Sequence, residues 1–262
     1  SDSDGLPDTY ETDNGLNPNN ASDASTDADG DGLTVLKEFR YGTSDNNPDS
    51  DFDTIPDGWE VANGRNSTKS DYEVSAGVQH TCALDDNGIQ CWGDNNQRQT
   101  DVPINLVNPI AVSAGNYHTC ALDDNGIQCW GNVGYGQSNV PYSLKNPVAI
   151  ISDGFHACAL DDNGVHCWGQ NYYGQTDIPT DLVNPVAVAA GVNFTCALDD
   201  NGVQCWGRNS SGQIDVPTDL VNPVSVVAGE THACAIDDNG VQCWGYDMYG
   251  QATVPTDLVN PV

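Results

Sequence analysis

Carboxylates near the start of the chain recur at a spacing that suits calcium. Residues 27–38, DADGDGLTVLKE, fit the pattern D-x-D-x-D-G-x5-E at every position. In such a loop three aspartates wrap one side of the ion, the glycine permits a sharp turn, and the final glutamate supplies two oxygens. We therefore predict a Ca²⁺ loop whose ligands are Asp27, Asp29, Asp31, Glu38 and the main-chain carbonyl of Leu33.

Two less regular copies of this pattern flank the first one. The following copy has Thr54 in place of the turn glycine, and its predicted ligands are Asp49, Asp51, Asp53, Asp57, Glu60 and the carbonyl of Ile55. The preceding copy is truncated at Ser1, and its predicted ligands are Asp2, Asp4, Asp8 and Glu11. A solvated acidic linker without ordered metal is the alternative. Because residues 1–73 carry 14 Asp and 4 Glu against four Lys or Arg, cation-free folding would be opposed by self-repulsion, which favours calcium.

Each acidic loop is predicted to continue into a short helix. Prolines suited to a first helical turn and glycines suited to a helix end stand at Pro7, Pro56, Gly15, Gly42 and Gly64. The stretches DADGDGLTVLKEFRYGTSDNNPDSD and IPDGWEVANG resemble bacterial thrombospondin type 3 repeats, apart from Phe52, Thr54 and Ile55. The resemblance implies that residues 1–70 form a calcium-stiffened connector beside a surface domain, and not a calcium sensor.

Ten cysteines form five pairs, each with eight residues between its members, and zinc sites usually need closer pairs. A four-residue turn over Asp85–Gly88 would place Leu84 opposite Ile89, and therefore Cys82 opposite Cys91 on the same face. We predict the disulfides Cys82–Cys91, Cys120–Cys129, Cys158–Cys167, Cys196–Cys205 and Cys234–Cys243. Disulfides persist in oxidising surroundings, so the pattern predicts an extracellular location.

The cysteine pairs belong to a unit of 38 residues that is written five times without insertion or deletion. Its tryptophan recurs at Trp92, Trp130, Trp168, Trp206 and Trp244. Each unit reads as a strand of small residues followed by a hairpin with apolar residues on both faces, which must be buried between neighbouring units. The predicted fold is mainly β: five propeller-type tandem blades over residues 71–262, after a small N-terminal segment of calcium loops and short helices.

The unit G-x-x-H-T-C-A-L-D-D-N-G-x-x-C-W-G, followed by G-x-Q, resembles repeats of the regulator of chromosome condensation family, a seven-bladed propeller. Its short length is similar to the three-stranded blades of beta-lactamase inhibitor protein II. The cysteine pairs are additions to the family pattern. Five units are also too few for a seven-bladed ring. Either they close on themselves, or further repeats lie beyond Val262, or a neighbouring molecule fills the gap.

Charge and composition exclude several function classes. Lys and Arg number 7 against 38 Asp and Glu, and a net charge of −31 repels the phosphates of nucleic acids. No apolar run approaches the roughly 18 residues of a membrane span. The chain begins partway through an acidic motif without signal-peptide features, so we expect the natural chain to begin further upstream. No set of nucleophile, base and acid recurs, and we predict no enzymatic activity.

Three further groups of residues invite a functional interpretation. Histidines precede four cysteines at His80, His118, His156 and His232, but Phe194 takes this place in the fourth unit, which favours packed, hydrogen-bonded rings. Tyrosines of the variable loops could contact a glycan or a protein, or simply cover the blade rim: Tyr135, Tyr172, Tyr173, Tyr246 and Tyr249. Asn66 and Asn209 are the more accessible of four N-x-S/T glycan acceptor candidates.

Together these features predict a secreted bacterial cell-surface protein with a structural or adhesive role. It would bind calcium and self-associate through its blade edges, as a homo-oligomer or an extracellular filament. A second hypothesis is a protein-binding propeller that occludes a partner, as the inhibitor resemblance implies. A third, an enzyme that uses the propeller mouth, has the least support.

Overall fold

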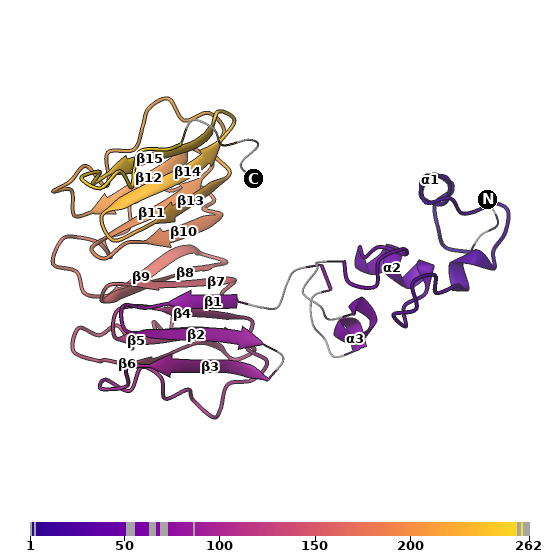
Figure 1. Ribbon diagram of the computed structural model, residues 1–262, viewed down its shortest axis with the longest axis horizontal. Coiled ribbons are helices and arrows are strands. Elements are labelled where there is room, and N and C mark those ends of the chain that lie inside the picture. The colour runs from indigo at the N-terminus through magenta and orange to yellow at the C-terminus, as the bar shows by residue number, and fades with distance from the viewer. Residues whose placement is uncertain are drawn as a thin grey trace. The chain divides into compact units, whose positions relative to one another are not determined.

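The computed structural model describes residues 2, 4–50, 56–62, 67–68, 73–85, 87–255 and 258. It divides the chain into two units, residues 1–72 and 73–262 (Figure 1). Within the described residues, no helix combines the length and the apolar character that a membrane crossing requires.

The first unit consists of short helices joined by acidic loops. They are α1 (Asp8–Asp13), the 3-10 helix η1 (Asp23–Ser25), α2 (Val35–Tyr41) and α3 (Asp57–Ala62). Pro7 precedes α1 as its N-cap, and Gly42 ends α2 at a φ of 80°, as the sequence predicts. Gly64 lies outside the described residues. Among the described residues of this unit, one apolar cluster gathers Leu6, Ala24 and Val35 with a few partly buried neighbours, and Leu33 is also buried. This core is small for an independently stable unit.

The second unit consists of five antiparallel sheets of three strands each, which follow one another in chain order in Figure 1. The first strands are β1 (Glu73–Ala76), β4 (Ala111–Ala114), β7 (Ala149–Asp153), β10 (Ala187–Ala190) and β13 (Ser225–Ala228). The middle strands are β2 (His80–Asp85), β5 (His118–Asp123), β8 (His156–Asp161), β11 (Phe194–Asp199) and β14 (His232–Asp237). The third strands are β3 (Gly88–Gly93), β6 (Gly126–Gly131), β9 (Gly164–Gly169), β12 (Gly202–Gly207) and β15 (Gly240–Gly245). We call these sheets blades 1 to 5.

The hairpin register agrees with the prediction, but the turn is shorter than expected. In blade 2, Cys120 pairs with Cys129 and Leu122 pairs with Ile127, as the sequence predicts. Strand pairing continues to Asp123 and Gly126, so the turn has two residues and not four. Gly126 makes this possible because its φ of 104° is open to glycine and strained for other residues. The strand register is the one predicted, because the two-residue turn has the same centre as the predicted four-residue turn.

All five predicted disulfides are present, and no cysteine is free. Each joins the middle and third strands of one blade, with Cα atoms 4.0–4.1 Å apart. The bridges therefore staple every hairpin internally and do not link one blade to the next.

In blades 2 to 5, the two aspartates of the hairpin turn hold the connection that enters the blade. In blade 2, the Asp123 carboxylate accepts from the N–H of Val107, and the Asp124 carboxylate accepts from the side-chain amide of Asn108. Asn108 has a φ of 46°, which asparagine tolerates. The same contacts recur in blades 3 to 5. In blade 5 the corresponding backbone N–H, that of Val221, helps to hold the pKa of Asp237 below its usual range. These acids thus have structural partners, and turn chemistry accounts for them.

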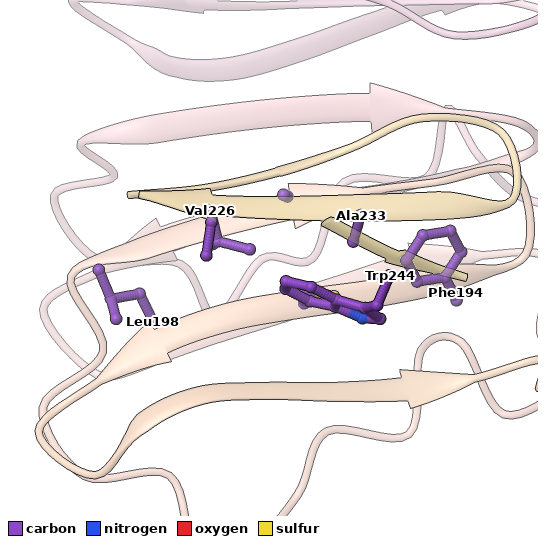
Figure 2. Close-up of a cluster of buried hydrophobic side chains, with 8 residues drawn as sticks. Phe194, Leu198, Val226, Ala233 and Trp244 are labelled. Atoms are coloured by element: carbon purple, nitrogen blue, oxygen red, sulfur yellow. The ribbon is translucent and has the colours of Figure 1, made fainter. Parts of the chain in front are cut away.

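Neighbouring blades bury their apolar faces against each other. Figure 2 shows the contact between blades 4 and 5, where Trp244 and Val226 of blade 5 gather with Phe194 and Leu198 of blade 4. Equivalent clusters lie between the other neighbours. The first strands of successive blades also contact one another along the whole array. Each interior blade thus has two buried faces. The face that carries its tryptophan packs on the preceding blade, and the face that carries its disulfide packs on the following blade.

Candidate calcium loops and open blade faces

The first acidic loop gathers four carboxylates around one point. Asp2, Asp4, Glu11 and Asp23 each offer an oxygen, and these atoms all lie within 4.8 Å of one another. Glu11 is fully buried, and neither of its carboxylate oxygens has a hydrogen-bond partner. Burial and the neighbouring acids raise the pKa of Glu11. A buried carboxylate without a partner is unfavourable unless a cation compensates it or it takes up a proton.

Asp23 is a member of this group that sequence reasoning missed. It begins η1, twelve residues after Glu11, and the loop pattern assigns no ligand there. Its Oδ2 accepts from the N–H of Asn17, which leaves Oδ1 buried and without a partner beside the other acids. Asp8, which the pattern includes, is exposed and lies outside the group. A search for acids beyond the loop itself would have raised Asp23 as a candidate.

The middle loop brings Asp27, Asp29 and Asp31 within the same 4.8 Å limit. Asp27 accepts from the N–H groups of Gly30 and Gly32, and the N–H of Leu33 donates to Asp31 at 2.6 Å. These hydrogen bonds hold the backbone of the loop. The carboxylates keep further lone pairs that could bind a cation.

Glu38, the predicted last ligand of the middle loop, stands in α2 outside this group of three aspartates. It is fully buried, and both of its oxygens lack partners. Burial first, and then the charges of Asp29, Asp31 and Asp45, raise its pKa to about 8. Asp45 is itself buried and was not among the predicted ligands. This concentration of acid is what a cation site would require, and cation binding here remains a prediction.

The third loop is only partly visible. Asp51, Asp53 and Ile55 lie outside the described residues. Asp57 is buried, and its carboxylate accepts from the N–H and the hydroxyl of Ser50 at 2.8 and 2.6 Å. Asp57 therefore has a hydrogen-bonding role that the pattern did not anticipate. Glu60 is also fully buried.

The middle and third loops are joined through Gly58 in α3. Its N–H donates to Asp31 Oδ2 at 2.7 Å, across 27 residues of sequence. A Cβ atom at this position would overlap the carbonyl oxygen of Asp31, so only glycine permits the approach. The oxygen-only donors of the first two loops fit a hard divalent cation such as Ca²⁺, whose binding remains a prediction.

The outer faces of blades 1 and 5 form the second candidate site. On the outer face of blade 1, the head face, lie Val74, Thr81, Ala83 and Trp92. Trp92 is 53% exposed, whereas the other four blade tryptophans are 7–9% exposed, because no blade precedes it within the described chain. Val74 is 72% exposed, and its equivalent Val112 in blade 2 is 1% exposed.

The outer face of blade 5, the tail face, is also exposed, and it corresponds to the opposite side of the contact between neighbouring blades. It carries the side chains that interior blades bury against the following blade: Val227, His232, Cys234, Ile236 and Val241. Val227 is 58% exposed, whereas its equivalents Ser113 and Ala189 are buried and Ile151 is partly buried. The two ends of the array therefore present the two different halves of one repeated contact, and both are apolar.

The histidines line the blade contacts as packed rings, and their hydrogen bonding is less uniform than predicted. His80 Nε2 lies 2.8 Å from Thr119 Oγ1, and His156 Nε2 lies 3.0 Å from Thr195 Oγ1. His118 is fully buried, and neither of its ring nitrogens has a side-chain partner. Burial, with the nearby histidine rings, lowers the pKa of His118 to about 3, and burial lowers that of His156 to about 4.

The variable loops carry a surface group of aromatic side chains. The ring of Tyr135 lies 5.1 Å from that of Phe155 and 5.9 Å from that of Tyr172, and the guanidinium of Arg208 lies 5.2 Å from the ring centre of Tyr173. Tyr135, Tyr172 and Tyr173 are exposed.

Of the two glycan acceptor candidates, only Asn209 can be placed. It is exposed, and its amide nitrogen donates to Asp215 at 2.7 Å. Asn95 and Asn171 make the same contact in other blades, so the contact belongs to the fold of this loop. Asn66 lies outside the described residues.

The fold and its stacked faces define a tandem-repeat protein of the propeller class. Residues 73–99, 110–137, 154–175, 186–213 and 224–251 match the family profile of the regulator of chromosome condensation (RCC1) repeat. The chain belongs to the family of proteins built from these repeats. All matched residues lie in the second unit, so the likeness of the first unit to thrombospondin type 3 repeats remains a prediction, as does the likeness of the blades to beta-lactamase inhibitor protein II. No curated protein sequence matches the chain.

Solved structures with the same fold include propellers from plants, yeast and humans. The ectodomain of the Physcomitrella patens receptor kinase CR4 is 28% identical with a TM-score of 0.56, over 66% of this chain and 50% of that one. Prp20p from Saccharomyces cerevisiae is 20% identical with a TM-score of 0.57, over 67% and 58%. Human WBSCR16 is 20% identical with a TM-score of 0.60, over 72% and 64%. The chain thus spans less than two thirds of each of these structures.

Proposed function

We propose that this chain is an extracellular structural and adhesive protein that self-associates through its two open blade faces. The observation that carries the proposal is the exposure of Trp92, Val74 and Val227 at positions that the interior blades bury fully or in part. Exposed apolar faces of this kind are typical of interaction sites. Because the exposed faces are opposite halves of the same contact, one copy offers what another copy lacks.

An extracellular location is supported by the disulfides and by one relative. Five bridges in one chain, all inside hairpins, suit an oxidising environment and would be reduced in most cytosols. The CR4 structure, whose identity to this chain is 28%, is the ectodomain of a receptor kinase.

The first unit would serve as a calcium-stiffened connector. Its apolar core is small, and two of its buried glutamates, Glu11 and Glu38, lack partners for both oxygens. Calcium would neutralise these carboxylates and fix the loops, at the millimolar concentrations typical of extracellular fluids. The role assigned to the whole chain is binding and assembly, without catalysis.

Imaging and sedimentation of the intact oxidised chain test this proposal. In millimolar calcium we expect the mean mass to rise with protein concentration, and elongated or ring-shaped particles to appear in negative stain. Reduction of the disulfides should dissolve these particles because it loosens the blade faces. A chain that stays monomeric up to the highest soluble concentration would contradict self-association.

A second candidate function is a propeller that occludes a protein partner. The aromatic group around Tyr135 and Tyr172 favours it, since exposed aromatic residues are typical anchors of protein interfaces. Propellers with the same fold bind proteins: one structure shows Kap60 bound to yeast RCC1, and another study concerns binding of Prp20p to Gsp1p and histones. This candidate predicts a monomer that forms a one-to-one complex, weakened at least tenfold by Tyr135→Ala and Tyr172→Ala.

A further inference from the structure

Aromatic side chains gather on one surface of blades 2 and 3, at the end of the blades opposite the hairpin turns. Each blade contributes the turn between its first and middle strands and the loop that follows its third strand. Main-chain bonds join the two segments: the N–H of Asn132 donates to the carbonyl of Tyr117 at 2.8 Å, and that of Gln170 donates to the carbonyl of Phe155 at 2.9 Å. We call the rings of these segments the aromatic patch: Tyr117, Tyr135, Phe155, Tyr172 and Tyr173.

The rings of the patch form a connected group across the two blades. The ring of Phe155 lies 5.7 Å from that of Tyr117 and 5.1 Å from that of Tyr135, which in turn lies 5.9 Å from that of Tyr172. The turns beneath the rings are also joined, since the N–H of Asn116 donates to the carbonyl of Gly154 at 3.0 Å. The patch is therefore one surface and not a scatter of exposed side chains.

The fold of the repeat does not require these rings. Blades 1 and 4 have polar residues at the corresponding positions: Gln79, Asn96, Gln97, Asn193, Ser210 and Ser211. Their loops nevertheless keep the hydrogen bond from a backbone N–H to a glutamine side chain that is also present at Tyr135. Covering the rim of a blade therefore does not explain why rings gather on blades 2 and 3.

An acid lies at the border of the patch, at a position where the other blades have glycine. Asp153 ends β7, two residues before Phe155. The corresponding residues are Gly77, Gly115, Gly191 and Gly229. In blade 3 the glycine follows one position later, at Gly154, which has a φ of 51°. The carboxylate of Asp153 accepts from the N–H of Gly154 and forms no ion pair within the part of the chain that the structure describes. A residue that departs from the repeat without joining another element is typical of a binding site.

The charge around the patch is negative. Burial, and then the charge of Glu230, raise the pKa of Asp153 to about 6. The loops of blades 3 and 4 add the exposed acids Asp177 and Asp215, and the sequence of these loops has Arg208 as its one base. A cation bound here would relieve the repulsion between these carboxylates.

We infer that the aromatic patch binds a basic segment of another protein, with a guanidinium or ammonium group directed to Asp153. Arginine suits both features, because its guanidinium stacks on aromatic rings and pairs with carboxylates. The chain shows such a stacked contact itself, where the guanidinium of Arg208 lies 5.2 Å from the ring centre of Tyr173. A neutral glycan would leave Asp153 without a counter-charge, and an acidic glycan would be repelled.

This inference rests on the second candidate function, protein binding, and names the chemical class of its partner. It does not depend on self-association, because blades 2 and 3 each have a neighbouring blade on both sides.

Selection from a displayed library of short random peptides, with the intact oxidised chain in calcium as the target, tests the inference. We expect the selected peptides to be rich in arginine and lysine, and their affinity in fluorescence anisotropy to fall as salt is added. Asp153→Asn should weaken their binding about tenfold, because it removes the charge at the border of the patch. Asp153→Gly should do the same and should fold, since it supplies the residue of the other four blades. Tyr135→Ala should also weaken binding about tenfold.

The matched controls are Asp181→Asn and Tyr142→Ala. They change an exposed acid and an exposed ring that lie in connections between blades, outside the patch and its loops. Both should bind the peptides like the parent, and circular dichroism should show the parent's fold in every variant.

Each other outcome contradicts a separate step. Neutral or acidic peptides whose binding depends on Tyr135 would leave protein binding standing and overturn the basic class of the partner. Basic peptides that bind equally well to the Asp153 variants or to Tyr135→Ala would overturn the site. If no peptide is selected, whether or not a glycan array shows binding, the inference is wrong. Sedimentation of the parent tests self-association separately: a monomer that binds basic peptides at the patch would contradict self-association and leave this inference standing.

Discussion

Glu38 is the residue of the first unit at which we expect a bound cation to have the largest effect. It is buried among acids, without a partner for either oxygen, and its pKa is raised to about 8. We expect Glu38→Gln to have opposite effects with and without calcium. In chelator the change removes a buried acid that prefers to be neutral, so the thermal midpoint of the first unit should rise. In calcium it removes a ligand charge, so affinity should fall at least tenfold.

Calorimetric calcium titration and thermal unfolding with and without chelator measure these two effects. Asp13→Asn is the matched control, since Asp13 is an exposed acid at the end of α1. It should change neither quantity by more than a small surface-charge effect. A Glu38→Gln chain that loses stability in chelator would show that Glu38 has a structural partner.

Gly58 is the residue through which one acidic loop supports another. Gly58→Ala would push a Cβ atom into the carbonyl of Asp31 and lengthen the bond from Gly58 N to Asp31 Oδ2. We expect at least a tenfold loss of calcium affinity at the middle loop, about 1.4 kcal/mol. Calorimetry measures it, with the exposed substitution Ala21→Ser as the control. Unchanged affinity would mean that the middle loop does not depend on α3.

At the scale of the element, the stapled hairpin is the unit of stability. Each bridge closes a loop whose cysteines are nine positions apart, which the chain-entropy model values at roughly 2–3 kcal/mol. Replacing Cys158 and Cys167 by serine in the central blade should lower the free energy of unfolding by about that amount or more, because Cys158 is fully buried. Denaturant unfolding measures it. The same change at Cys234 and Cys243 should cost less, since Cys234 lies on the open tail face.

The buried histidines make the blade contacts sensitive to acid. The pKa of His118 is lowered to about 3 and that of His156 to about 4, from the usual 6.5. Between these values and pH 6.5 the unfolded chain binds protons that the folded chain does not. Stability is therefore full above pH 6.5 and falls as the pH drops toward 4, by roughly 2 kcal/mol for each ring at pH 5.

A variant isolates the contribution of one ring. In His118→Phe the new ring faces Ala157 of the next blade, as Phe194 faces Ala233. The variant should therefore keep the stability of the parent at neutral pH and lose less stability at pH 5. Denaturant midpoints at pH 7 and pH 5 measure the difference. Equal acid sensitivity in the variant and the parent would exclude His118 as a cause.

The blade architecture was predictable because its signals are local and repeated. The distance from Cys82 to Cys91, read together with the turn residues, predicted the register, and the alternation of Ala83 and Leu84 predicted two buried faces. The predicted length of the turn was wrong. Gly126 and its counterparts adopt a positive φ, which allows them to form one more strand pair, such as Asp123 with Gly126, before the turn. Periodicity predicts which residues face each other more readily than where pairing stops.

The acidic clusters were predicted less completely, because acids from outside the repeated pattern also join them. Asp23 reaches the first cluster from η1, and Asp45 lies near Glu38 from beyond α2. Asp57 fits the pattern in spacing, yet its carboxylate holds Ser50. Loop spacing predicts the backbone of a calcium loop, whereas such contacts depend on how short helices fold back on it.

At the scale of the whole molecule, the two units have separate cores. We expect calcium to stabilise the first unit and the disulfides to stabilise the second. We expect a chelator to remove the thermal transition of the first unit while the β signal of the propeller in circular dichroism persists. A reductant should do the reverse, lowering the propeller transition and sparing the calcium-dependent one. Calorimetric scans of the intact chain under the two conditions measure this. A single transition that shifts under both treatments would show that the units unfold together.

The placement of the staples has a mechanical consequence for a protein exposed to flow or traction. Each bridge clasps the middle and third strands of a blade, and leaves the first strand and the connecting loop unclasped. Pulling on the chain could peel away the unclasped part, while the covalently closed hairpin would stay short. Under force the five blades would then unfold in five similar steps, each releasing only the first strand and its loop. Refolding would start from hairpins that the disulfides had kept folded.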